Sequence, residues 1–138
     1  GGLGALMLPW EDRLQAAYIG QPTFGNHPIR LQCKCVGSGE SVRQYAKTHP
    51  EVIDVLVYYD AATAASRIQI PVLTQACLFD PAVCPPGQFS VANAITSAGS
   101  KTHVALAGHF AGFPGEFEEN RRLVQSRQAF FADYLPSK

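Results

Sequence analysis

The 138-residue chain is poor in charge: only 16% of its residues are Asp, Glu, Lys or Arg, and 11 basic residues balance 11 acidic ones. No segment gathers Lys and Arg into a stripe that would neutralise a phosphate backbone, so nucleic acid is not an expected partner. No apolar run approaches the roughly 20 residues that a helix needs to cross a bilayer, so no membrane is expected as a partner either. With 46% hydrophobic residues, the chain has enough apolar material for one compact core.

The sequence also has no initiator methionine and no basic n-region of a secretory signal at its start. It opens Gly-Gly-Leu-Gly-Ala-Leu-Met-Leu, an apolar and glycine-rich segment of the kind that is ordinarily buried. Gly1 and Gly2 alone would fit a remnant of an expression vector, but the apolar residues after them would not. We therefore expect the chain to start inside a fold.

Cysteine is scarce and its spacing selects no structure. Cys33, Cys35, Cys77 and Cys84 permit three disulfide connectivities. They do not decide whether the protein works in an oxidising or a reducing compartment. One C-x-C and two scattered cysteines lack the paired spacing of structural zinc sites, so no metal site is predicted. Burial as small apolar side chains is the favoured role, above all for Cys77, which lies inside an apolar run.

The chain does contain short helical and apolar segments in a succession that predicts an α/β layer arrangement. Capping residues, apolar spacing and flanking Pro or Gly predict helices over residues 1–8, 38–48, 52–65, 85–98 and 116–135. Short apolar or alternating runs predict strands over residues 14–20, 70–79 and 101–107. Residues 23–36 have no sustained period and are interpreted as a loop.

Two titratable residues come directly after two of the predicted strands. The apolar run 70–79 stops at Asp80-Pro81, where the backbone must leave regular structure, and His109 follows residues 101–107 in the same way. In open α/β sheets, ligands and catalytic groups gather beyond the carboxyl ends of the strands, so both residues are candidates for chemistry. An Asp before Pro is also an ordinary turn residue, which is the alternative for Asp80.

Asp80 before His109 is the chain order of acid and base in α/β-hydrolases, in which a nucleophilic serine precedes both. The acid orients the imidazole, and the imidazole takes the proton from the attacking hydroxyl. No complete G-x-S-x-G motif occurs upstream of Asp80: Ser38 has glycines at the wrong spacing, and the other candidate serines lie in predicted helical segments. A nucleophile elbow, however, leads into a helix that begins with glycine and small apolar residues, as residues 1–8 do. We therefore expect Gly1 to end that motif and the serine to lie two positions before it.

The run YYDAATAASRIQIPVLTQACLFDPAVCPPGQFSVANAI, followed by Gly-His-Phe and a final helix, resembles the C-terminal half of the acetyl xylan esterase/cephalosporin C deacetylase family. The resemblance extends from about Tyr58 onward. It implies that Asp80 is the triad acid, that His109 is the triad base, and that Gly1 and Gly2 are the glycines after the nucleophile elbow. The implied fold class is α/β, the C-terminal part of an α/β-hydrolase fold with a mostly parallel sheet flanked by helices, incomplete at the N-terminus. Residues 1–138 would belong to a single domain, with 23–69 as a loop and helical insertion before the acid-bearing strand.

The resemblance also implies an activity: removal of acetyl groups from short xylo-oligosaccharides, and sometimes from cephalosporins, through an acyl-enzyme and without a metal or other cofactor. It implies a small acetylated carbohydrate or related ester as substrate, allows a homo-oligomer and favours the cytoplasm. The sequence departs from the family pattern by one extra residue between Asp80 and Pro85, and by Phe110 after His109, where many members have Glu. Two alternatives stay open: a hydrolase-like module that lost catalysis and serves binding or assembly, and another α/β-hydrolase such as a peptidase or a dienelactone-hydrolase-like enzyme.

The remaining histidines, and two aromatic residues near His109, are expected to have mainly structural roles. His27 and His49 each precede Pro and are expected at the surface or in turns, whereas His103 is expected to be a structural side chain within a strand. Phe110 and Phe113 are candidates for an acyl pocket, with packing in the core as the favoured alternative.

Overall fold

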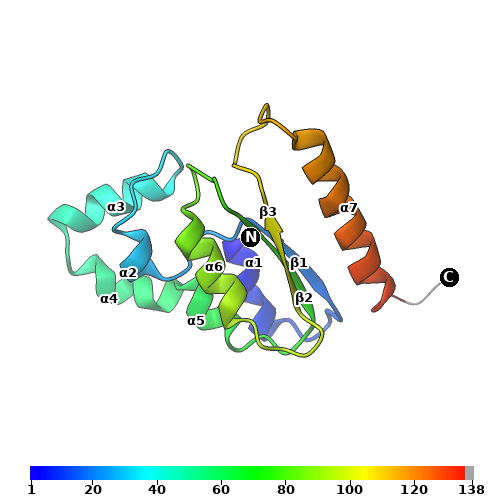
Figure 1. Ribbon diagram of the computed structural model, residues 1–138. Helices are drawn as coiled ribbons and strands as arrows, with labels where there is room; N and C mark the ends of the chain where they lie inside the picture. Colours follow the sequence, from blue (N-terminus) through cyan, green and yellow to red (C-terminus); the bar gives the residue numbers. More distant parts are fainter. Residues whose placement is uncertain (136–138) are drawn as a thin grey trace.

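A computed structural model describes residues 1–135 and contains a three-stranded parallel sheet with helices on both faces (Figure 1). The strands β1 (Ala17–Gly20), β2 (Val72–Cys77) and β3 (Lys101–Ala105) lie side by side in the order β1-β2-β3. Because all three strands run in the same direction, their carboxyl ends meet at one edge of the sheet. The predicted α/β fold with a parallel sheet is therefore confirmed.

Helices α1 (Gly2–Met7), α5 (Ala61–Ala65) and α6 (Pro85–Ala94) pack together on one side of the sheet, and α7 (Glu116–Ala132) lies against β3 on the other (Figure 1). The core between α1, α5, α6 and the sheet is built mainly from small and aliphatic side chains that are buried completely or nearly so, among them Ala5, Ile19, Ala61, Ala65, Val72 and Val91. Alanine at the helix contacts permits close approach, and the aliphatic residues supply most of the apolar area removed from water.

The segment between β1 and β2 is more helical than predicted. It contains α2 (His27–Arg30) within the predicted loop, then α3 (Gly39–Thr48) and α4 (Val52–Leu56). The single helix predicted over 52–65 is wrong, because the chain passes through a 3-10 turn, η2 (Val57–Tyr59), and leaves helical geometry at Asp60. The Asp60 carboxylate accepts the N–H groups of the first turn of α5, so a new helix starts there.

Several predicted ends differ from the observed ones. The three strands are shorter than predicted, and α6 ends at Ala94 because Ile95 is extended, well before Gly99. Pro9 does not close the first helical segment, because it lies in a 3-10 turn, η1 (Leu8–Trp10), where its missing N–H costs no hydrogen bond. These differences of a few residues leave Asp80 and His109 beyond the ends of β2 and β3.

His27 is not at the surface, which corrects the prediction from its neighbour Pro28. Its side chain is 1% exposed, and its Nε2 lies 3.3 Å from the carbonyl oxygen of Tyr59. Its main-chain N–H donates to Asp60 Oδ2 at 2.8 Å, so one carboxylate joins α2 to α5. Burial lowers the pKa of His27, which favours a neutral imidazole.

The four cysteines are free thiols, and Cys77 is buried in β2 as predicted. Within residues 1–135, no helix is both long enough and apolar enough to span a bilayer.

Candidate active site

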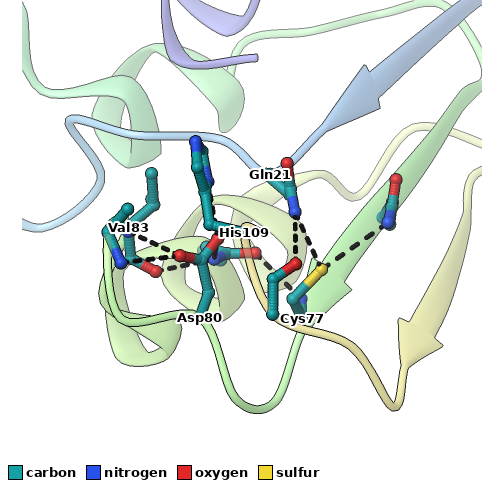
Figure 2. Close-up of polar contacts among 9 residues, drawn as sticks. Gln21, Cys77, Asp80, Val83 and His109 are labelled. Carbon is teal, nitrogen blue, oxygen red and sulfur yellow. Dashed lines mark hydrogen bonds and ion pairs between the residues drawn. The ribbon is translucent and has the colours of Figure 1, made fainter. Parts of the chain in front are cut away.

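Asp80 is buried just beyond the carboxyl end of β2, with 3% of its surface exposed. Its Oδ1 accepts the main-chain N–H groups of Ala82 and Val83, both at 2.8 Å. Its Oδ2 faces the imidazole of His109, with Nδ1 at 3.2 Å (Figure 2). Asp80 therefore fits both the turn-forming and the catalytic interpretation, because Oδ1 holds the turn and Oδ2 is available to orient a histidine.

His109 stands beyond β3 with 39% of its side chain exposed, whereas the Asp80 side chain is fully buried. The contact with Asp80 places the proton of a neutral imidazole on Nδ1 and leaves Nε2, on the other side of the ring, as an acceptor. Within residues 1–135, Nε2 of His109 forms no hydrogen bond. A buried acid on Nδ1 and an open Nε2 is the arrangement that a general base requires.

Two glutamines support this pair, and sequence reasoning missed both. Gln88 of α6 is completely buried; its Nε2 donates to Asp80 Oδ2 at 3.1 Å, and its Oε1 accepts the N–H of Cys77 at 2.8 Å. Gln21 follows β1 and donates from Nε2 to the carbonyl oxygen of Gly108 at 3.1 Å (Figure 2). Gln88 thus fixes the acid, and Gln21 fixes the backbone directly before His109. The signal for Gln88 was a polar side chain on the buried side of a helix that starts five residues after Asp80.

We expect Gln88→Leu to lower kcat of the full-length protein about 10- to 100-fold while leaving KM nearly unchanged. The substitution keeps the side-chain volume but removes a donor to Asp80 and an acceptor for the Cys77 N–H, so the acid loses its fixed orientation. Steady-state kinetics on an activated acetyl ester measures the effect, and Gln128→Leu on the exposed side of α7 is the matched control. Equal kcat values for the two variants would contradict a positioning role for Gln88.

An apolar cavity of about 610 Å³ opens beside His109. Its walls include Phe79, Leu106, Phe110 and Phe113. The ring of Phe110 also meets the imidazole edge-on, with centroids 5.4 Å apart. Phe110 and Phe113 thus both line an apolar cavity next to His109, whose volume lies in the range of ligand pockets.

The buried thiol of Cys77 lies beside this site without the features of a nucleophile. Burial raises its pKa, and its Sγ is 3.3 Å from Gln21 Nε2 and 3.5 Å from Gln75 Nε2. Since the thiolate is the reactive form, a raised pKa argues for a structural role. No group of three or more His, Cys, Asp or Glu side chains within the described part of the chain is placed to hold a metal ion.

A second chain of polar contacts surrounds His103, and it joins β3 to α7. His103 Nε2 lies 3.0 Å from Glu119 Oε1, and its Nδ1 lies 3.0 Å from Ser126 Oγ. Arg122 completes the cluster with a contact of 3.1 Å to Glu119 Oε2. The acid here contacts Nε2 and the serine contacts Nδ1, which is the reverse of a catalytic triad, so this cluster is interpreted as the polar contact between helix and sheet.

Gly1 and Gly2 lie at the N-terminal end of α1, against the segment that follows β1. A Cβ on Gly1 would come within 2.2 Å of the Gly20 carbonyl oxygen, and one on Gly2 within 2.0 Å of the Thr23 carbonyl oxygen. Only glycine fits such close backbone contacts. The first turn of α1 therefore stands at the same edge of the sheet as Gln21, which contacts Gly108 beside His109.

A parallel sheet with an acid beyond one strand and a histidine beyond its neighbour is the arrangement of an α/β-hydrolase fold. The chain is similar in structure to an acetyl xylan esterase from Paenibacillus sp. R4, with a TM-score of 0.73 and 20% identity over 97% of this chain and 42% of that one. It is also similar to acetyl xylan esterase 1 from Thermoanaerobacterium sp. JW/SL YS485, with a TM-score of 0.68 and 21% identity over 88% and 40% of the two chains. Porphyromonas gingivalis dipeptidyl peptidase 4 matches with a TM-score of 0.67 and 16% identity over 97% of this chain and 18% of that one.

These likenesses establish the fold as part of an α/β-hydrolase fold, in agreement with the fold expected from the resemblance. The chain spans about two fifths of the length of each of the two esterases. No protein-family model matches the sequence, and no curated protein matches it.

Proposed function

We propose that the protein is a serine carboxylesterase that removes acetyl groups from acetylated xylo-oligosaccharides or related esters, and that this chain supplies its acid and base. The observation that carries the proposal is the 3.2 Å contact between a fully buried Asp80 carboxylate and Nδ1 of a half-exposed His109. The structural similarity to two acetyl xylan esterases supports the choice of ester.

The nucleophile in this proposal is a serine two positions before Gly1. Its helix, α1, begins at the edge of the sheet where Asp80 and His109 meet, and the close backbone contacts of Gly1 and Gly2 fit a nucleophile elbow. The N–H of the residue after the serine would then be one oxyanion donor, as in other α/β-hydrolases. Residues 1–138 would form the C-terminal portion of a single domain, with 23–69 inserted before β2.

The chemistry results from the orientation of the imidazole. Nε2 of His109 takes the proton of the serine as its oxygen attacks the acetyl carbonyl, and then gives that proton to the departing sugar hydroxyl. In the second half of the reaction, Nε2 takes a proton from water as the water oxygen attacks the acetyl-serine, and it returns that proton to the serine oxygen as acetate leaves. Asp80 stabilises the imidazolium in both halves of the reaction, while the apolar cavity beside His109 offers contacts to the acyl group.

The proposal is tested by measuring acetate release from 4-nitrophenyl acetate and from acetylated xylo-oligosaccharides with the full-length protein. We expect release from both. A dipeptide 4-nitroanilide belongs in the same panel, because the dipeptidyl peptidase has a similar fold. Turnover of the peptide without any ester hydrolysis would replace the esterase by a peptidase, and no turnover at all would favour a non-catalytic module.

A further inference from the structure

Three of the four cysteines gather where the segment between α2 and α3 meets the loop that follows Asp80. Cys33 and Cys35 lie between the two helices, and Cys84 ends that loop directly before α6. The Cys84 Sγ atom is 3.7 Å from the carbonyl oxygen of Cys33 and 3.9 Å from that of Lys34, across 51 and 50 residues of sequence. A buried thiol therefore lies directly against the backbone of the C-x-C segment.

The backbones of the two segments are held together by contacts that do not involve sulfur. The N–H of Val36 donates to the carbonyl oxygen of Pro81 at 2.8 Å. A Cβ on Gly37 would come within 2.5 Å of the Ala82 carbonyl oxygen, so only glycine fits this close approach. Ordered backbone therefore keeps the thiols of the two segments at close range.

The three side chains differ in their exposure and direction. Cys35 and Cys84 are each 9% exposed, whereas Cys33 is half-buried. The thiol of Cys35 faces the carbonyl oxygen of Gly37, 4.0 Å away, and its N–H donates to Glu40. Burial, followed by the neighbouring thiols of Cys33 and Cys35, raises the pKa of Cys84 to about 11. Cys84 is thus a protonated thiol with two thiol neighbours, of which Cys33 is more accessible to a reagent in solvent.

We propose that Cys33 and Cys84 form a reversible disulfide that joins the α2–α3 segment to the loop after Asp80. The oxidant is a small disulfide such as glutathione disulfide. The Cys33 sulfur loses its proton and attacks one sulfur of the oxidant, and one glutathione leaves as a thiol. The Cys84 sulfur then loses its proton and attacks the Cys33 sulfur, and the second glutathione leaves as a thiol. Two protein thiols thus lose two electrons and two protons, which one glutathione disulfide gains.

The position of Cys84 compensates for its low reactivity. A protonated thiol is a poor nucleophile, but Cys84 attacks a sulfur that is held next to it, so the second step is intramolecular. Burial also raises the pKa of Cys77, but the polar neighbours of its thiol are the amides of Gln21 and Gln75. The disulfide would close a loop of 51 residues, which restricts the unfolded chain and stabilises the folded one. The site is separate from the proposed esterase chemistry and requires no substrate.

The test maps the disulfides of the full-length protein after incubation with glutathione disulfide, blocking of free thiols with N-ethylmaleimide and digestion with trypsin. Trypsin cuts after Lys34 and thereby places Cys33 and Cys35 in different peptides. Fragment ions separate Cys84 from Cys77, which lies in the same tryptic peptide. We expect the Cys33 peptide linked to Cys84, and no link after treatment with dithiothreitol. A link from Cys84 to Cys35, or glutathione adducts alone, would overturn the proposal.

Two variants and a second readout test which thiol is needed. Cys84→Ala should prevent the link, while Cys77→Ala, which removes the other buried thiol of the same tryptic peptide, should leave it unchanged. If Cys84→Ala does not fold, the disulfide map of the wild-type protein still decides the question.

The melting temperature of the wild-type protein should rise by about 4–10 °C on oxidation and return to its former value on reduction. Cys84→Ala should show no such rise. A rise that persists in Cys84→Ala would mean that another pair of cysteines is responsible and would overturn the proposal. Both readouts are independent of catalysis, so an inactive protein with this disulfide would reject the esterase function alone.

Discussion

Asp80→Asn should lower kcat of the full-length protein about 10³- to 10⁴-fold with a small change in KM. The asparagine oxygen can still accept the N–H groups of Ala82 and Val83, so the turn after β2 is kept. Its amide group cannot accept the Nδ1 proton of His109, so the imidazole loses both its orientation and its stabilising charge. Initial rates on an activated acetyl ester measure the loss.

The matched control for this variant is Asp54→Asn, which changes an exposed carboxylate on α4 in the same way. Asp54→Asn should keep the melting temperature of the wild type, whereas Asp80→Asn should lower it by a few degrees, because its buried amide faces the Nε2 donor of Gln88. Rates measured well below both melting temperatures separate the loss of rate from a loss of folding. Unchanged turnover in Asp80→Asn would remove Asp80 from the triad and leave it with its turn-forming contacts alone.

His109→Ala should have the larger effect, a fall in kcat of about 10⁴- to 10⁶-fold, because the variant has no group to take the serine proton. The wild-type side chain is partly exposed and faces an apolar cavity, so its removal leaves an opening beside the Asp80 carboxylate. Added imidazole should therefore restore part of the activity in a concentration-dependent way.

His49→Ala provides the comparison, because His49 lies at the end of α3, where its imidazole contacts Thr48 and Tyr45 and is far in sequence from Asp80 and His109. It should keep full activity and show no response to imidazole. A His109→Ala variant that retains more than a tenth of wild-type activity would mean that another group acts as the base.

The pairing of Asp80 with His109 was predictable because it depends on local patterns. Each residue follows a short apolar or alternating run, and such strands in a parallel sheet deliver the residues after them to the same edge. The predicted strands around them are confirmed, although each is shorter than expected. The catalytic roles of the two residues stay predictions.

The features that sequence reasoning missed depend on contacts between distant segments. Helix 52–65 is interrupted because the Asp60 carboxylate caps α5, and the same carboxylate holds the buried backbone of His27. The burial of Arg30 results from the glycine-rich turn into α3 closing over its guanidinium. No periodicity reports such contacts, since each of them joins residues whose spacing along the chain is arbitrary.

The support of the site by Gln88 has a similar cause. A polar residue on the buried side of a helix indicates a polar contact without naming its partner, and here the Gln88 amide contacts the acid, the carbonyl oxygen of Val83 and the end of β2. The loop between Asp80 and Pro85 is the segment that this amide spans. A fully satisfied buried amide can hold such a loop in one conformation.

The central claim is that this chain supplies the acid and base to a serine two positions before Gly1. The most direct measurement is to label the full-length protein with an organophosphonate probe and to locate the adduct by tandem mass spectrometry, with the isolated 138-residue chain labelled in parallel. We predict one adduct, on that upstream serine, and none on the isolated chain. An adduct on any serine within residues 1–138 would contradict the claim.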